Sequence, residues 1–487
     1  MKHWTLKRSA AGAASSSLSA LAAAASGSTG QGVTVGIISD SFDALGGAAL
    51  DEAGGQLPTA GAINILKDDP TGTDEGRAIA QLVHAIAPNA GIDFYSGDFG
   101  QADFAAGIAA LRAAGANVIV DDLSYPNEPF YQLGSPIDRA IHNFVAGGGT
   151  YVTAAGNAGP LSFYEGSFAG GTTDLPGVGS VTAMNFGTAD APTYREPMSV
   201  TGGDATTIDL QWAQPWLYGG GAGSAYSLAV ALYGPRGKLV RTFAADAQGG
   251  NPVQIGTFTP PRSGVYSVAI YANDGTDPGG LFKIVGDNNA DPPVIFAGSS
   301  GSGSDYGHVL SPAAITVGAD DYLGSPSLGG TPSAEDFSSS GPGELLFSPN
   351  GQAPPNPVGL TKTDVAGPDG FGTTVPNISP FFGTSAAAAA VAADAALLLQ
   401  DGPGLTARQI RRILALSATP DGSPLQSGAG LVDPQTALGE ILRNGATASL
   451  AESPLHVAAQ SSVMPAGVAS HPTLSHLHLR GSFDLGS

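Results

Sequence analysis

The sequence predicts an α/β fold with a doubly wound, mostly parallel sheet, into which an all-β sandwich is inserted. Between residues 32 and about 185, continuous apolar runs alternate with segments whose apolar residues fall on one helical stripe. Between about 195 and 295 the pattern changes to short alternating segments separated by Gly, Pro, Asn and Asp, which is typical of antiparallel strands. Continuous apolar runs indicate strands buried on both faces, as in parallel sheets covered by helices on each side.

The elements of the α/β part are expected in strict strand and helix alternation. The run "VTVGII" (33–38) is the first strand, and a helical stripe over residues 78–86 follows it. Further along come "IDFYS" as a strand, residues 101–113 as a helix, "ANVIVDDLS" as a strand, "IDRAIHNFV" as a helix and "TYVTAAGN" as a strand. After the insert, "AAITVGA" (313–319) is a strand, and two helices begin near Ser385 and Thr406. The alanine run after Ser385 predicts a helix that packs close to the sheet.

This pattern predicts four parts of the chain. They are a signal peptide or alanine-rich arm at residues 1–30, a discontinuous α/β domain at 31–190 plus 300–445, the β-sandwich at 191–299, and a tail at 446–487. The tail contains four of the eight histidines. Its alternating pattern favours an exposed strand or a disordered segment over a metal-binding tract.

Composition excludes several classes of function. The formal net charge of −22 argues against nucleic-acid binding, which needs a basic surface to displace counterions from phosphates. The absence of cysteine excludes disulfides, a cysteine nucleophile and thiolate metal sites. No segment reaches the roughly 18 consecutive apolar residues of a membrane span. Together with the low lysine content, these features predict an exported, monomeric protein of bacterial type.

Three polar residues follow predicted strand ends or begin a helix, where an open α/β sheet forms its binding crevice. They are Asp40 in "VGIISDSFD", Asn157 in "YVTAAGNAGP" and Ser385 in "FFGTSAAAAA". Their residue types suit an orienting carboxylate, an amide donor to an oxyanion and a nucleophile at a helix N-terminus. Each alone is also an ordinary turn or capping residue.

In their order and context, these stretches resemble the subtilisin-like serine proteases, the subtilases. The resemblance extends from residue 32 to about 440 and includes "YGHVLSPAAITVGA" (306–319), "EDFSSSGP" (335–342), "KTDVAGPDG" (362–370) and "GAGLVDPQTAL" (428–438). It implies a subtilisin-like sheet, a polypeptide substrate, Ser385 as nucleophile, Asn157 as oxyanion donor and Asp40 as the acid of the triad. No organic cofactor is implied. Calcium is common in the family, but no ligand spacing here is specific enough to name a metal site.

The sequence departs from the subtilase pattern at the catalytic base. Subtilases place His-Gly-Thr at the start of a helix, where this chain has Glu75-Gly76 within "GTDEGRAIAQLVHAIAP" (72–88). His84 lies nine residues further along, about 13.5 Å at 1.5 Å per residue, and roughly half a revolution round the helix, so it cannot replace Glu75. For His142 and His308, structural packing is favoured over catalysis.

A glutamate base on this fold resembles the sedolisins, whose triad is Glu, Asp and Ser. The match is partial, because sedolisins carry Asp one turn after the Glu, where this chain has Ile79, and an Asp in the place of Asn157. Asp74, Asp121 and Asp122 are further carboxylates that could approach Glu75, although turn and strand-end roles are favoured. Two carboxylates within hydrogen-bonding distance cannot both ionise cheaply. A bell-shaped, acid-shifted pH profile is therefore expected.

The predicted function is that of a serine endopeptidase that forms an acyl-enzyme on Ser385, with Glu75 as general base. Gly383 is expected to let the substrate backbone approach closely. Tyr125 follows the strand that borders the cleft in subtilases and is expected to shape a substrate pocket.

Two alternatives remain open. Glu75 could be a first-turn residue stabilised by its helix N-terminus, in a non-catalytic descendant that holds a polypeptide without cutting it. Ala389 in place of the usual Pro, and Phe42 in place of the usual Gly, agree with such divergence. A glycosidase that uses paired carboxylates is disfavoured, because it leaves Ser385 and Asn157 unexplained.

Overall fold

The computed structural model describes residues 27–433, except 246, 248, 276 and 289–291, together with residue 437. All of these belong to the first of two compact units, Met1–Leu450, and the second unit is Ala451–Ser487. The predicted N-terminal arm, up to residue 26, and the predicted histidine-containing tail lie outside the described residues.

The first layer of the fold is a seven-stranded sheet in the order β2-β3-β1-β4-β5-β17-β20, and every neighbouring pair in it is parallel. Its strands are β1 (Thr34–Ser39), β2 (Ile63–Lys67), β3 (Gly91–Ser96), β4 (Val118–Asp121), β5 (Thr150–Ala154), β17 (Ile315–Asp321) and β20 (Val365–Asp369). The chain reverses its direction of strand addition at β1 and β4, since β1 lies between β3 and β4. The doubly wound parallel sheet predicted from the apolar runs is confirmed.

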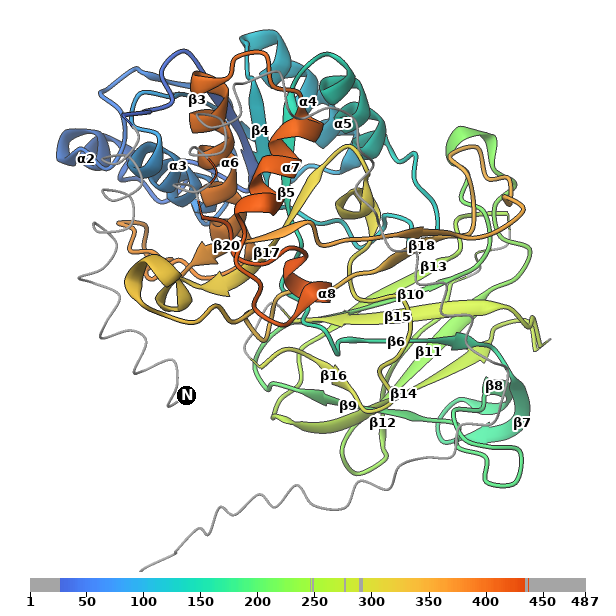
Figure 1. The fold of residues 1–487 in the computed structure, drawn as a ribbon. Helices are drawn as coiled ribbons and strands as arrows, with labels where there is room; N and C mark the ends of the chain where they lie inside the picture. The colour runs from blue at the N-terminus through green and yellow to red at the C-terminus, as the bar shows by residue number, and fades with distance from the viewer. Residues whose placement is uncertain are drawn as a thin grey trace, which may run out of the picture. The chain divides into compact units, whose positions relative to one another are not determined.

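Helices cover both faces of this sheet (Figure 1). One side carries α3 (Glu75–Ile86), α6 (Thr384–Asp401) and α7 (Ala407–Ser417), and the other carries α4 (Gln101–Ala114) and α5 (Pro136–Ala146). Successive strand residues serve the two sides in turn: Ile37 packs with the α3 and α6 side chains, and Ile38 packs with those of α4 and α5. The short helices α2 (Ala48–Gly54) and α8 (Pro424–Ser427) complete the helical part.

Helix α6 runs through the middle of the core. Every side chain from Thr384 to Leu399 is buried, as expected for a helix that is apolar on all sides. Its alanines allow a very close approach to the sheet: a Cβ atom on Gly367 of β20 would lie 2.4 Å from the carbonyl oxygen of Ala387. The predicted packing of the alanine run against the sheet is confirmed.

Two antiparallel sheets follow β5 in the chain. One has the order β13-β10-β15-β6, and the other has the order β12-β11-β14-β8-β7, with β9 paired to β14 and β16. Their strands are β6 (Phe163–Ser167), β7 (Gly170–Leu175), β8 (Gly179–Met184), β9 (Glu196–Val200), β10 (Thr206–Trp212), β11 (Leu228–Tyr233), β12 (Leu239–Phe243), β13 (Val253–Phe258), β14 (Gly264–Ala272), β15 (Leu281–Asp287) and β16 (Ile295–Phe296). Both sheets contribute to one apolar cluster, with Leu210 and Ile284 from the first and Val230 and Ile270 from the second, so they form a sandwich.

The antiparallel strands begin at Phe163, before residue 191, where the sequence analysis starts the insert. Strands β6 to β8 carry segments such as "GGTTDL" (170–175), which are half exposed and lack a continuous apolar run. They pair within the sandwich because only a strand buried on both faces suits the parallel sheet.

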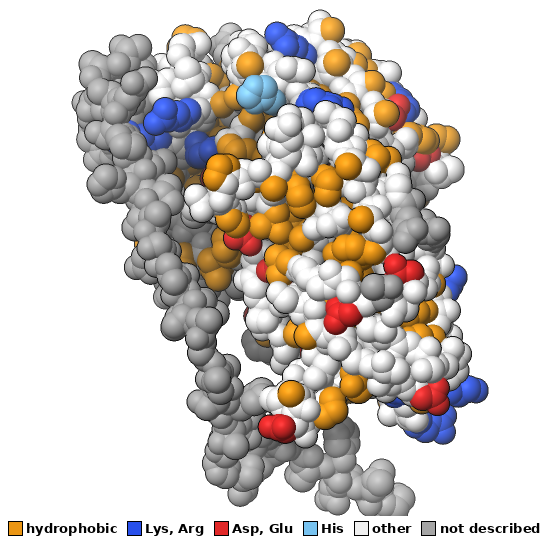
Figure 2. All heavy atoms as spheres, turned by 90° about the vertical axis from the view of Figure 1, so that its right-hand side faces the viewer, with side chains coloured by type: hydrophobic (Ala, Val, Ile, Leu, Met, Phe, Trp, Pro, Cys, Tyr) orange, Lys and Arg blue, Asp and Glu red, His pale blue; other side chains and the backbone are white. Residues whose placement is uncertain are grey.

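Short elements connect these layers. They are the two-stranded sheet of β18 (Gly343–Leu345) and β19 (Val358–Leu360), and the 3-10 turns η1 (Tyr218–Gly220), η2 (Gly307–Leu310), η3 (Tyr322–Gly324) and η4 (Pro326–Leu328). Among the helices of the described residues, none has the length and apolar character needed to cross a bilayer. On the face shown in Figure 2, Lys and Arg side chains lie in small separate groups among polar and apolar ones.

Candidate active site

Ser385 is the second residue of α6 and is 4% exposed. Gly383 precedes the helix with φ of 120°, a conformation that favours glycine, and its N–H donates to Asp369 Oδ2 at 2.9 Å. The N–H groups of the first helical turn have no acceptor within the helix. The Ser385 hydroxyl therefore lies beside backbone donors that can stabilise a developing negative charge.

Asn157, in the loop after β5, is tied to the same turn. Its Oδ1 accepts hydrogen bonds from the backbone N–H and the hydroxyl of Thr384, both at 3.0 Å. These two donors fix the orientation of the amide, so its Nδ2 group is directed away from Thr384 and lies close to Gly383. Thr384 therefore orients Asn157 and does not cap α6, whose N-cap residue is Gly383.

Glu75 is the first residue of α3 and meets Ser385 across the cleft. The hydroxyl of Ser385 is within hydrogen-bonding reach of the Glu75 carboxylate. Burial raises the pKa of Glu75, the Ser385 hydrogen bond lowers it, and the charge of Asp40 raises it further. The net effect is a raised pKa, which suits a group that must accept and return a proton near neutral or mildly acidic pH.

Asp40, at the end of β1, holds the start of α3 in place. Its carboxylate accepts hydrogen bonds from the N–H and the hydroxyl of Thr73 at 2.5 and 2.6 Å, and from the Glu75 N–H at 3.0 Å. Asp40 thus caps the helix from a distant part of the chain and fixes the backbone of Glu75. Its effect on the Glu75 side chain is electrostatic.

The carboxyl group that hydrogen-bonds with Glu75 is that of Asp122, just beyond β4. Asp122 Oδ2 also accepts from the Ser39 hydroxyl at 3.2 Å. The sequence analysis counted Asp122 among several carboxylates and favoured a strand-end role for it. The usable signal was its place after the central strand β4, which lies beside β1.

The Glu75 and Asp122 pair has no cation between its members to neutralise it. Burial raises the pKa of Asp122 well above its usual range, and the charges of Glu75 and Asp40 raise it further. The hydrogen bond from Asp122 lowers the pKa of Glu75. Asp122 therefore retains the shared proton and donates it in a hydrogen bond to Glu75, which is left ionised towards Ser385.

The other two carboxylates considered for this role pair elsewhere. Asp74 accepts a hydrogen bond from the buried Arg77 guanidinium at 2.6 Å, and Arg77 also binds Asp51 at 2.5 Å. Asp121 accepts from the Thr153 hydroxyl at 3.1 Å and lies 3.2 Å from His308 Nε2.

His308 is fully buried between two carboxylates. Its Nδ1 lies 2.5 Å from Glu128 Oε2, and its Nε2 faces Asp121. Burial lowers the pKa of His308, but the charges of Glu128 and Asp121 outweigh this effect and raise the pKa well above its ordinary value. The predicted structural role fits this geometry. His84 is half-buried on α3 and His142 is exposed on α5.

The remaining predicted residues have clear structural surroundings. The Tyr125 hydroxyl donates to the Gly97 carbonyl, and the Tyr125 ring packs edge-on against Phe104. Phe42, in the place of the usual glycine, buries its ring against Phe94, with 5.3 Å between ring centroids. Phe94 in turn fills the space where a side chain on Gly76 would stand, so glycine is required after Glu75.

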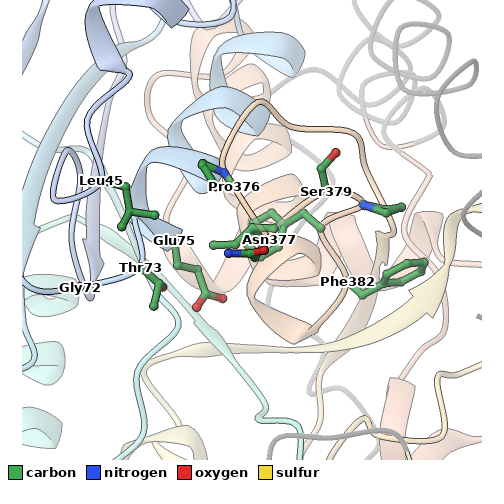
Figure 3. A pocket seen from close by; sticks show the side chains of 11 residues that line it. Leu45, Gly72, Thr73, Glu75, Pro376, Asn377, Ser379 and Phe382 are labelled. Atoms are coloured by element: carbon green, nitrogen blue, oxygen red, sulfur yellow. The ribbon is translucent and has the colours of Figure 1, made fainter.

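A cavity of about 440 Å³ opens beside Glu75 (Figure 3). Its walls are Leu45, Gly72, Thr73, Glu75 and the loop of residues 376–382 that leads into α6. Tyr125 does not line it. Among the described residues, no group of three or more His, Asp or Glu side chains is arranged to hold a metal ion, so the structure assigns no calcium ligand.

The fold and the site together define a serine hydrolase on a subtilisin-like α/β scaffold. The sequence matches the profile of the subtilase family over residues 57–431, which include Glu75, Asn157 and Ser385. The chain belongs to this family and is a subtilase-like serine peptidase. No curated protein matches the sequence at a significant level.

Solved structures of subtilisin-like proteases share this fold. The CspB protease of Clostridium perfringens has a TM-score of 0.53 and 16% identity, covering 89% of this chain and 99% of its own. A protease of Pseudoalteromonas arctica has a TM-score of 0.40 and 14% identity, covering 87% of this chain and 94% of its own. MycP1 of Mycobacterium smegmatis has a TM-score of 0.36 and 16% identity, covering 86% and 82%.

Proposed function

We propose that this peptidase is an endopeptidase that cleaves polypeptides through an acyl-enzyme on Ser385, with Glu75 as general base and Asn157 as oxyanion donor. The observation that carries the proposal is the hydrogen-bonding contact between the Ser385 hydroxyl and the Glu75 carboxylate. No histidine is needed, because a carboxylate with a raised pKa can accept the serine proton.

In the acylation step, the Ser385 oxygen attacks the carbonyl carbon of the scissile bond while its proton moves to Glu75. The new oxyanion is bound by the Ser385 N–H and by the Asn157 amide, whose orientation Thr384 fixes. The intermediate then expels the amine as Glu75 returns the proton to the leaving nitrogen. Water takes the place of the amine, and the same proton transfers in the opposite sense release the acid product.

Asp122 sets the range of pH in which this base works. At low pH Glu75 is protonated and cannot accept the serine proton. At high pH Asp122 loses the proton that it donates to Glu75, and two adjacent anions repel each other. Since the pKa values of both groups are raised, activity should follow a bell-shaped profile.

A fluorophosphonate probe, applied across pH 3 to 8, tests this proposal directly. We expect labelling of Ser385 in the native protein and its loss in Glu75→Gln, which keeps the shape of the side chain but cannot act as a base. Glu52→Gln makes the same chemical change on α2, outside the cavity lining, and should label normally. Failure to label Ser385 at every pH would favour the alternative, a subtilase-fold protein that binds polypeptides without cutting them.

We also propose that the protein is exported and acts as a monomer. The basic residues at positions 2, 7 and 8, followed by an alanine-rich stretch, support export. Mass spectrometry of the N-terminus of the secreted protein would locate the cleavage point, and sedimentation would give the oligomeric state.

A further inference from the structure

We infer that the cavity beside Glu75 binds an apolar side chain of the substrate residue whose amine leaves, so that the peptidase selects peptide bonds that precede an apolar residue. This inference rests on the proposed function. It adds a specificity that the catalytic residues alone do not imply.

The position of the cavity identifies the side of the substrate that it meets. Glu75 lines it, whereas neither Asn157 nor Gly383 does. Glu75 must return its proton to the leaving nitrogen, which therefore comes within about 3 Å of the carboxylate. The Cα atom of the leaving residue is one bond of about 1.5 Å further on, so its side chain begins within about 5 Å of Glu75. The cavity is thus reached from the leaving side of the bond.

The walls of the cavity favour an apolar occupant. Figure 3 shows Leu45 on the side of the β1–α2 loop, facing the loop that carries Pro376, Asn377 and Phe382. Ile378, Pro380 and Phe381 add further apolar surface to this second wall. The volume of about 440 Å³ lies within the range of about 300–1,000 Å³ that is usual for ligand pockets.

Charge disfavours the other classes of side chain. Glu75 is the one ionisable side chain among the lining residues that the structure describes for this cavity. A lysine or arginine in the cavity would pair with Glu75 and remove it from catalysis. An aspartate or glutamate would be repelled by the same carboxylate. A neutral, apolar side chain leaves the base unaffected.

The second wall is held in place before any substrate binds. Phe381 and Phe371 exchange backbone hydrogen bonds, from Phe381 N–H to the Phe371 carbonyl at 2.6 Å and from Phe371 N–H to the Phe381 carbonyl at 3.2 Å. The Thr373 hydroxyl donates to the Ile378 carbonyl at 2.5 Å, and the Thr373 N–H donates to the Ser379 hydroxyl at 3.2 Å. Such a preformed wall limits the entropy that a bound side chain must lose, so it can discriminate between side chains.

Acyl transfer offers a test in which the leaving residue is added from solution. An ester of one fixed peptide acid is hydrolysed in the presence of the amides of Leu, Phe, Gly, Lys or Asp, which compete with water for the acyl-enzyme. We expect Leu and Phe amides to capture the acyl group at least about tenfold more often than the other three. The ratio of aminolysis to hydrolysis is independent of the amount of active enzyme, so partial unfolding does not distort it.

Variants link this preference to the cavity. Ile378→Asp should abolish the preference for Leu and Phe amides, whereas Leu416→Asp, on α7 at a side chain that is 58% exposed, should retain it. Equal capture of all five amides, or a preference unaffected by Ile378→Asp, would overturn the inference while ester hydrolysis continues. Absence of any ester hydrolysis would instead overturn the proposed function, and this inference with it.

Discussion

Asp121 and Asp122 are consecutive residues at the end of β4, and they have opposite electrostatic surroundings. Asp121 is fully buried and faces His308, which a second carboxylate, Glu128, holds from the other side. Asp122 faces Glu75, with no cation between them. Because successive strand residues point to opposite faces of a sheet, one position lies in a compensated ion cluster and the other in an uncompensated carboxylate pair.

The difference separates structural from reactive electrostatics. In the Asp121 cluster, the positive charge of His308 compensates the two carboxylates, which favours ionised groups and a fixed geometry. In the Asp122 pair, two acids compete for one proton, which raises the pKa of both and makes proton transfer cheap. The two regions are separated by one peptide unit, so the first can position the second.

The largest expected effect tests the reactive side of this comparison. Glu75→Gln should lower kcat for peptide hydrolysis by about 10⁴-fold or more, because Ser385 loses its base. Initial rates with a fluorogenic peptide mixture near the pH optimum measure the loss. Activity within about tenfold of the native protein would show that another group takes the serine proton.

The structural side is tested by His308→Ala. Removing the imidazolium leaves Asp121 and Glu128 buried without a cation, which should cost about 3–5 kcal/mol of unfolding free energy. Urea denaturation measures this loss, and His142→Ala, at an exposed site on α5, should change stability by less than about 0.5 kcal/mol.

The pH dependence of that stability has a definite sign. The pKa of His308 is raised in the folded protein, so its contribution is fully present below the ordinary histidine pKa and is lost as pH rises through the raised value. The groups that face it are Asp121 and Glu128, with the ring of Phe104 alongside. The difference in stability between native protein and His308→Ala should therefore be larger at pH 6 than at alkaline pH.

Much of the catalytic framework could be predicted from the sequence, because it depends on local patterns. Apolar runs located the parallel strands, the alanine run located α6, and strand-end polar residues located Asn157 and Ser385. The partner of Glu75 could not be predicted, since it depends on which strands are neighbours and which face each residue takes. Asp121 and Asp122 are identical in sequence terms, and only the placement of His308, some 190 residues later, separates their roles.

A smaller effect is expected at Asn157. Asn157→Ala removes one oxyanion donor but leaves Glu75 and Asp122 in place, so kcat should fall by about 10²–10³-fold with little change in KM. Because Thr384 loses the acceptor for its N–H and hydroxyl, thermal unfolding of the variant should be recorded as a control. A loss of activity that follows the loss of folded protein would assign Asn157 a structural role only.

The smallest effect distinguishes the two aspartates themselves. In Asp122→Asn the amide can still donate a hydrogen bond to Glu75, so the acid limb of the pH profile should stay in place. The alkaline limb should disappear, because the group whose ionisation causes it is gone. One pH unit above that limb, the variant should therefore be about tenfold more active relative to its own optimum than the native protein. Asp121→Asn should retain the alkaline limb and lose stability instead, because His308 then keeps a single carboxylate partner. An alkaline limb that persists in Asp122→Asn would show that the proton beside Glu75 belongs to a different group.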